Sequence, residues 1–127
     1  MLNLAFVMLG GAIGSGLRYG ASLWVSSPAD RFPMATFLVN LVGCAVFGFL
    51  AGWGATTGLL RDEVRLFILV GLLGGLTTFS SFSYESMRLF ESGHSGTAIT
   101  YIALSNVLGL VLAWSSYRLA MQVFTSG

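Results

Sequence analysis

Two phenylalanines and the hydroxyl residues between them are the part of this sequence best suited to bind a small ion. Phe79 and Phe82 stand three residues apart, so their rings share a face if the backbone there is helical. Thr77, Ser80 and Ser83 are interleaved with them. Because an aromatic ring has an electropositive edge, two such edges beside hydroxyl donors would hold an anion without a fixed positive charge, which would slow its release. Simple packing of the two rings is the competing interpretation.

Asn40 is a second candidate for ion contact. It is the only amide in a long apolar stretch, and Thr36 lies one turn before it. An amide carries N–H donors and a carbonyl that are costly to expose to lipid unless they find partners. Asn40 therefore either makes a hydrogen bond to another helix or offers its N–H groups to a passing anion.

Two charged residues inside apolar stretches have both structural and functional interpretations. Arg18 stands seven residues before Val25, about 10 Å along a helix, and is either an anchor that reaches the membrane surface or a positive group at the mouth of an anion path. Glu85 has Arg88 three residues on, and this spacing predicts a local ion pair.

The remaining reactive residue types do not form a catalytic arrangement, so we expect no enzyme activity. His94 stands in a Gly/Ser loop, where a solvated side chain is expected, and Cys44 stands in an apolar stretch, where a small packing residue is expected. The sequence has no metal-ligand cluster and no nucleophile with a base beside it.

The composition predicts an integral membrane protein. Of 127 residues, 55% are hydrophobic and 9% are charged, whereas a soluble domain carries about 25% charged residues. The net charge is +1 and there is no Lys, which argues against a nucleic-acid partner. We expect the apolar N-terminal segment to be retained, because it is too long for the core of a signal peptide.

These residues are expected to lie on four membrane-spanning helices in one domain covering residues 1–127. The apolar segments are residues 2–25, 34–56, 66–90 and 97–124, and each reaches the roughly 20 residues that a span requires. Polar connections are expected at residues 26–33, 57–65 and 91–96. The predicted fold is all-α, with both termini on the same side of the membrane.

The third segment is expected to be broken near the middle of the membrane. Residues 66–76 are apolar but would cover only about 16 Å of a hydrocarbon core about 30 Å thick. The Gly74-Gly75 pair and a run rich in Ser and Thr follow, a poor sequence for a continuous helix. Irregular backbone at that depth must be buried in protein or line a watery cavity. Carbonyls freed around residues 74–77 would make a cation site.

Glycine spacing and charge placement both suggest close association of helices, including helices of a second subunit. Small residues four apart favour tight packing of membrane helices; these pairs are Gly10/Gly14, Gly16/Gly20, Gly48/Gly52, Gly71/Gly75 and Ser105/Gly109. Arginines are nearly balanced between the two sides, with Arg61, Arg65 and Arg118 on the side of the termini and Arg31 and Arg88 on the other, where Arg18 joins them if its side chain reaches that way. Without an excess on one side the chain can insert both ways, so an antiparallel homodimer is possible.

Three motifs together resemble the Fluc (CrcB) family of microbial fluoride channels. They are GGLTTFSSFS at residues 74–83, TFLVNLVG at residues 36–43, and GGAIG with LRY between residues 10 and 19. The resemblance extends over the whole chain in length, number of spans and order of motifs. It implies an antiparallel, dual-topology homodimer in the plasma membrane, with two pores that export cytoplasmic fluoride passively and so give fluoride resistance.

The resemblance also assigns roles to particular residues. It implies that Phe79 and Phe82 line the pore with their ring edges toward fluoride, alongside Asn40 and Ser80. It implies a structural Na⁺ at the centre of the dimer, held by the backbone carbonyls of Gly74 and Thr77 from both subunits. Arg18 corresponds to an arginine near the vestibule.

The match is less regular at two positions. Ser81 stands where the family often has Thr, which keeps the hydroxyl. On the fourth helix an ungapped alignment gives Tyr101 and Ser105 as the polar track but puts Gly109 where serine is common; a shift of one residue gives Asn106 instead.

Two other functions compete with a fluoride channel. A small multidrug exporter also has four spans but needs a titratable acid in its first helices, and the first two segments contain no Asp or Glu. A membrane subunit that only helps another protein to assemble would carry no ions.

Overall fold

The computed structural model describes residues 2–25 and 32–125, which form helices joined by short connections. The elements are α1 (Leu2–Trp24), α2 (Met34–Thr57), α3 (Asp62–Arg65), the π-helix η1 (Leu66–Leu72), α4 (Leu73–Leu76), α5 (Phe79–Glu91) and α6 (Ser95–Thr125). The prediction of an all-α membrane protein is confirmed, because the described residues contain four stretches long and apolar enough to cross a membrane: Leu2–Trp24, Met34–Thr57, Asp62–Glu91 and Ser95–Thr125.

The boundaries of these spans differ from the expected ones mainly at the start of the third. Residues 57–65 were expected to form a polar turn, but Thr57 ends α2 and the third span already begins at Asp62. Gly58 terminates α2 with a positive φ of 64°, a conformation that glycine adopts without strain. Asp62 and Glu63 then occupy the first turn of α3, where acidic side chains stabilise the positive end of a helix.

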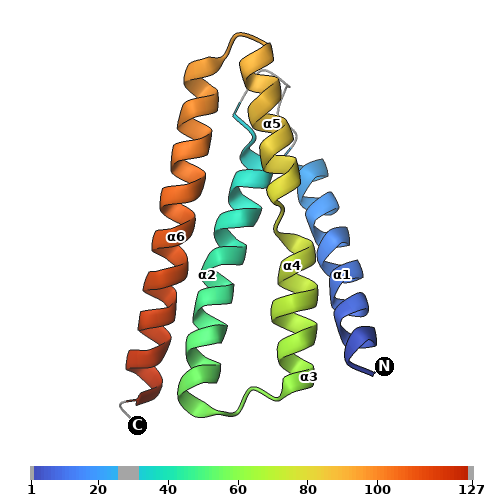
Figure 1. Ribbon diagram of the computed structural model, residues 1–127, viewed down its shortest axis with the longest axis vertical. Coiled ribbons are helices and arrows are strands. Elements are labelled where there is room, and N and C mark those ends of the chain that lie inside the picture. The colour runs from blue at the N-terminus through green and yellow to red at the C-terminus, as the bar shows by residue number, and fades with distance from the viewer. Residues whose placement is uncertain (1, 26–31, 126–127) are drawn as a thin grey trace.

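The four spans lie side by side, in the order α6, α2, α3–α5 and α1 across the view of Figure 1. Both described ends of the chain lie at one end of the molecule, together with the connection between α2 and α3, and the α5–α6 connection lies at the other end. α2 packs mainly on α6, and α1 packs mainly on η1 and α4. The buried apolar residues are few, and large apolar side chains are exposed along every span.

Glycines make the two main helix contacts possible. A Cβ on Gly10 or Gly14 would overlap the backbone of η1 and α4, and a Cβ on Gly71 or Gly75 would lie 3.1 Å or less from the backbone of α1. Gly48 and Gly52 meet α6 in the same way, at the carbonyls of Ala113 and Tyr117. The predicted small-residue packing is therefore present for these three pairs. Gly16 and Gly20 have nothing within 4 Å of an added Cβ in this chain.

Candidate functional site

The site is built around two residues of extended backbone between α4 and α5. Thr77 has φ −78° and ψ 154°, and Thr78 has φ −151° and ψ 123°. Thr78 is the N-cap of α5, and its Oγ1 accepts a hydrogen bond of 3.2 Å from the backbone N–H of Ser81. Threonine is favoured at this position because its hydroxyl oxygen satisfies a backbone donor that the helix cannot.

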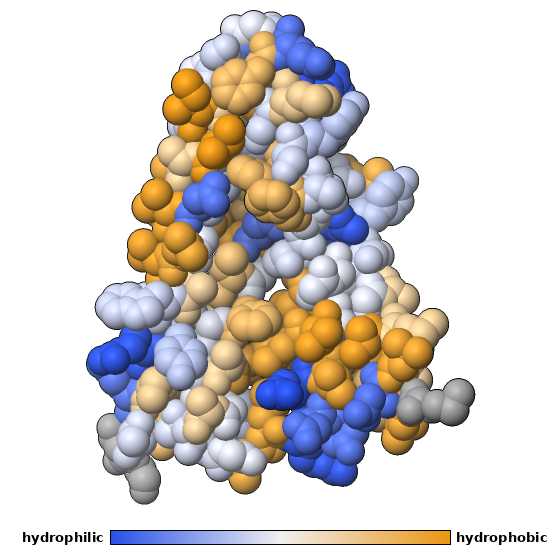
Figure 2. Space-filling model, viewed as in Figure 1, coloured by the Kyte–Doolittle hydropathy of each residue, from blue (hydrophilic) through white to orange (hydrophobic). Residues whose placement is uncertain are grey.

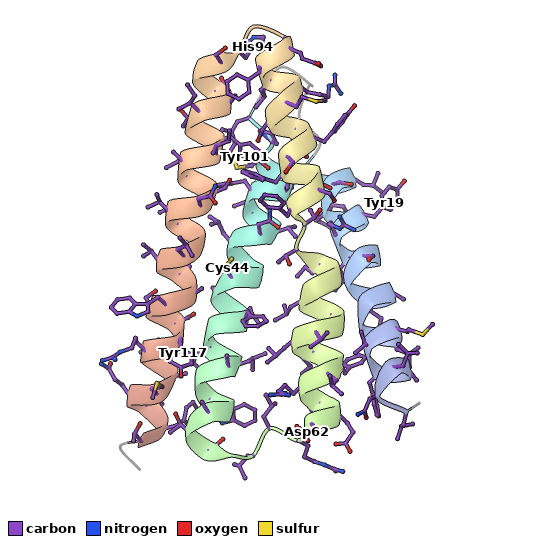
Figure 3. All side chains as sticks on the ribbon, in the orientation of Figure 1. Tyr19, Cys44, Asp62, His94, Tyr101 and Tyr117 are labelled. Atoms are coloured by element: carbon purple, nitrogen blue, oxygen red, sulfur yellow. The ribbon has the colours of Figure 1, made fainter. Side chains whose placement is uncertain are left out.

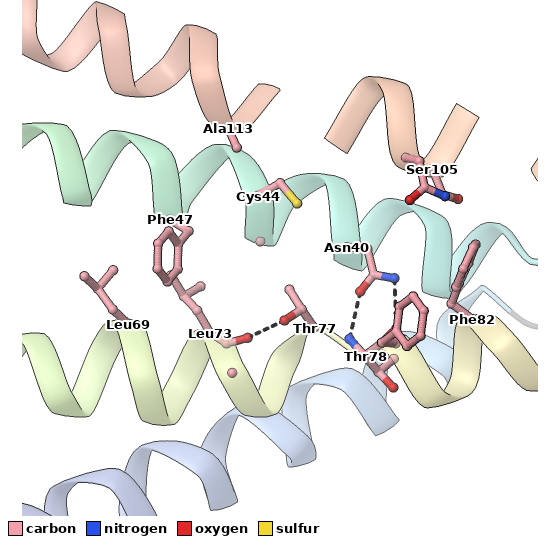
Figure 4. A pocket seen from close by; sticks show the side chains of 14 residues that line it. Asn40, Cys44, Phe47, Leu69, Leu73, Thr77, Thr78, Phe82, Ser105 and Ala113 are labelled. Atoms are coloured by element: carbon pink, nitrogen blue, oxygen red, sulfur yellow. Dashed lines mark hydrogen bonds between the residues drawn. The ribbon is translucent and has the colours of Figure 1, made fainter. Parts of the chain in front are cut away.

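Asn40 on α2 holds this extended segment by two hydrogen bonds (Figure 4). Its Oδ1 accepts from the backbone N–H of Thr78 at 2.9 Å, and its Nδ2 donates to the carbonyl of Thr78 at 3.2 Å. The interhelical hydrogen bond expected as one interpretation of Asn40 is therefore present. An amide nitrogen carries two N–H groups, so a second donor is available for another acceptor.

The same contacts release two backbone carbonyls. In a continuous helix the N–H of Thr78 would pair with the carbonyl of Gly74, and the N–H of Ser81 with the carbonyl of Thr77. Instead, the Thr78 N–H donates to Asn40 and the Ser81 N–H donates to the Thr78 hydroxyl. Gly74 also has open space where a side chain would stand. The two carbonyls expected to hold Na⁺ are thus the ones that the break frees, and oxygen donors of this kind fit a hard cation.

A cavity of about 530 Å³ lies beside the break, and Figure 4 shows the side chains around it. Predicted site residues from three spans line it: Asn40, Gly74, Thr77, Phe79, Phe82, Ser105 and Asn106. No Asp, Glu, Lys or Arg is among the described residues that form its wall. The wall is therefore mostly apolar, and the polar groups that it contains are all uncharged.

The two polar residues of α6 in this cavity differ in their hydrogen bonding. Asn106 donates from Nδ2 to the carbonyl of Ile102 at 2.7 Å, within its own helix. The Oγ of Ser105 is buried and has no hydrogen-bond partner among the described residues. A buried hydroxyl without a partner is energetically costly, so Ser105 is the member of this pair better prepared to contact a ligand.

The rings of the two phenylalanines are in contact, but their side chains differ greatly in exposure. Their ring centroids are 5.5 Å apart, with 41° between the planes. Phe82 is only 9% exposed and packs on Tyr101 at a centroid distance of 5.2 Å, whereas Phe79 is 77% exposed. Ser80 does not line the cavity; its Oγ lies 3.3 Å from Oγ1 of Thr78.

Glu85 does not form the predicted ion pair with Arg88. Its carboxylate accepts hydrogen bonds from the Thr36 hydroxyl at 2.7 Å and from the Tyr101 hydroxyl at 2.8 Å. Arg88 is exposed, and the described residues contain one ion pair, between Arg61 and Glu63. The spacing alone was misleading because two hydroxyl donors on neighbouring helices already satisfy this carboxylate.

Arg18 lines a second cavity, of about 260 Å³, between α1, α2 and α5. Hydroxyl residues dominate its wall, which also contains Glu85; the polar members are Ser15, Arg18, Tyr19, Ser22, Thr36, Ser81 and Glu85. Tyr101 reaches this cavity only through its hydrogen bond to Glu85. The sequence interpretation missed this group, although Ser81 and Glu85 are four residues apart and hence on one face of α5.

The comparisons with known proteins agree on one family. The family model described as CrcB-like protein, Camphor Resistance (CrcB), matches residues 5–117. A protein of Methylobacillus flagellatus is 44% identical over 121 residues, covering 94% of each chain. One of Stutzerimonas stutzeri is 43% identical, over 94% of this chain and 98% of its own, and one of Thermus thermophilus is 47% identical, over 89% of each. All three relatives are named fluoride-specific ion channel FluC.

Proposed function

Because the chain belongs to the CrcB family, we propose that it is a fluoride-specific ion channel of the plasma membrane, which lets cytoplasmic fluoride leave passively. The observation that carries this proposal is the neutral cavity beside the break in the third span. It combines ring edges, hydroxyls and an amide, which are donors of moderate strength. Moderate donors suit conduction, because an ion must be able to leave as well as enter.

The anion would lie at the start of α5. The N-terminus of this 13-residue helix carries a partial positive charge that favours an anion. Around it stand the edges of Phe79 and Phe82, the second N–H of Asn40 and the unpaired hydroxyl of Ser105. Ser80 and Tyr101 would support this path by fixing Thr78 and Phe82, and Arg18 would attract fluoride to the vestibule.

The working unit would be an antiparallel homodimer of chains inserted in both directions. Phe79 is largely uncovered in a single chain, and the four spans leave most of their large apolar side chains exposed. A second copy packed on this face would enclose both the ring and the cavity. The balance of arginines on the two sides agrees with dual insertion, although Arg31 lies outside the described residues.

A structural Na⁺ would lie where the two copies meet. The freed carbonyls of Gly74 and Thr77 from one chain supply two oxygen ligands, and a two-fold axis would supply two more. Na⁺ would add a positive field beside the anion path without any basic side chain in the cavity wall.

Fluoride release from liposomes tests the proposed function. Vesicles that contain only the purified chain are loaded with fluoride, and efflux is followed with a fluoride electrode, with chloride as the control anion. We expect rapid fluoride efflux and negligible chloride efflux. Proton movement that depends on an added drug would instead indicate an exporter, and no flux in either assay would indicate an accessory subunit.

A further inference from the structure

A cavity far from the proposed ion path lies where the first and third spans begin. It is an open groove of about 560 Å³, lined by the start of α1 and by the segment that leads into η1. Its apolar wall consists of Leu2, Phe6, Leu9, Val64 and Phe67, and its charged wall consists of Arg61 and Glu63. In Figure 2, hydrophilic surface at this end of the molecule adjoins apolar surface directly.

The location of this cavity is that of a membrane interface. Leu2 and Asp62 are the first residues of two spans, so the cavity reaches from the end of both helices into the hydrocarbon region. An occupant must therefore offer an apolar chain to Phe6 and Leu9 and a polar group to the charged wall. Lipid is the molecule of this chemistry that surrounds the protein at that depth.

The charged wall indicates which headgroup would fit. The Nε of Arg61 and the Oε2 of Glu63 are 3.7 Å apart, which is an ion pair but too long for a hydrogen bond. The Arg61 side chain is 79% exposed and that of Glu63 is 40% exposed. Both groups thus keep their hydrogen-bonding capacity for a headgroup that carries one anionic and one cationic, donating group.

We propose that this cavity binds a zwitterionic phospholipid with a free ammonium, phosphatidylethanolamine. Its phosphate would accept from the Arg61 guanidinium, its ammonium would donate to the Glu63 carboxylate, and one acyl chain would lie along Phe6, Leu9 and Phe67. The anionic lipid phosphatidylglycerol can donate only neutral hydroxyls to Glu63, and it brings a net negative charge near that carboxylate. A choline headgroup has no N–H to donate to Glu63.

Native mass spectrometry with defined lipids tests this site. The purified full chain in detergent is mixed with equal amounts of dioleoyl phosphatidylethanolamine and dioleoyl phosphatidylglycerol, and the retained lipid is counted. We expect preferential retention of phosphatidylethanolamine. Glu63→Gln should lower that retention about two- to fivefold, the range expected of an exposed charge contact, and should not lower retention of phosphatidylglycerol. Arg61→Gln should lower retention of both lipids.

Neighbouring residues supply matched controls, because they carry the same charges but do not line the cavity. Asp62→Asn and Arg65→Gln change the net charge by the same amounts and should leave lipid retention as in the unsubstituted protein. Equal effects of Glu63→Gln and Asp62→Asn would overturn the site, since general surface charge would then explain retention. Equal retention of both lipids by the unsubstituted chain, or no retained lipid because a second copy covers this face, would overturn it as well.

Discussion

The two halves of the third span are held in place by different kinds of contact. Below the break, η1 and α4 contact α1 through glycines, so that one backbone lies directly on the other. Above the break, α5 is held by side chains that reach across from α2 and α6: Asn40 to Thr78, and Thr36 and Tyr101 to Glu85. Figure 3 shows the labelled Tyr101 beside the upper part of the span and Asp62 at its lower end.

The residues that fix the position of the third span are therefore different from those that line the proposed ion path. A glycine contact has no side chain that can adjust, so the lower half has a single allowed position against α1. The upper half depends on individual hydrogen bonds, which single side-chain substitutions can remove one at a time. The proposed ion path begins where the first kind of contact gives way to the second.

Gly75→Val should have the largest effect, because it disrupts the glycine contact between α4 and α1. An added Cβ would lie 2.5 Å from the carbonyl oxygen of Gly11, and overpacking of this kind costs about 3 kcal/mol of the 5–15 kcal/mol that stabilise a typical protein. We expect little folded protein by size-exclusion chromatography in detergent. Gly16→Val is the matched control, since nothing lies within 4 Å of its Cβ. Equal yields from the two variants would contradict the glycine contact.

Asn40→Asp should strongly reduce conduction while the chain still folds. The new carboxylate can still accept the Thr78 N–H, but it no longer donates and places a negative charge beside the path. Two like charges a few ångströms apart in a protein repel by several kcal/mol, so we expect fluoride efflux to fall about 100-fold. Asn3→Asp, an identical change at an exposed position of α1, should conduct normally. Efflux within twofold of normal in Asn40→Asp would show that Asn40 does not contact the ion.

Phe82→Ile and Phe79→Ile should each slow fluoride efflux, but they should differ in stability. Loss of a ring edge should lower efflux about two- to tenfold, the worth of one aromatic contact. Phe82 also packs on Tyr101, so its replacement should lower thermal stability, whereas Phe79 is exposed within one chain. Phe90→Ile, on the same helix but outside the cavity, serves as the control. Normal efflux in both Phe79→Ile and Phe82→Ile would refute binding by ring edges.

The sequence predicted the glycine contacts between helices better than the hydrogen bonds around the proposed ion path. The glycine spacing correctly identified three pairs, which form two helix contacts, because small residues four apart leave a flat surface whatever lies opposite. The span boundaries were close for a similar reason, since apolar length is a property of each segment alone. The π-helical turns of η1 had no such signal, because residues 66–72 are uniformly apolar.

Hydrogen bonds between spans could not be predicted in this way. The acidic side chain of Glu85 was assigned to Arg88, its neighbour in sequence, but its partners Thr36 and Tyr101 are 49 and 16 residues away. Asn40 was recognised as important because an amide in an apolar helix needs a partner, yet the sequence did not identify Thr78 as that partner. The spacing of residues in the sequence identifies neighbours on the same helix, but it does not identify hydrogen-bond partners on another helix.

Tyr101→Phe should have the smallest effect, because it removes one of the two donors to Glu85 and keeps the ring that packs on Phe82. We expect a loss of about 0.5–1.5 kcal/mol in the free energy of unfolding, measured by titration with a denaturing detergent, and fluoride efflux close to normal. Tyr84→Phe, at an exposed position of the same helix as Glu85, should cost nothing measurable. Equal losses in the two variants would mean that the Tyr101–Glu85 bond contributes nothing. A Tyr101→Phe chain that fails to fold would instead place this bond with the glycine contacts, and the contrast between the two halves of the span would no longer hold.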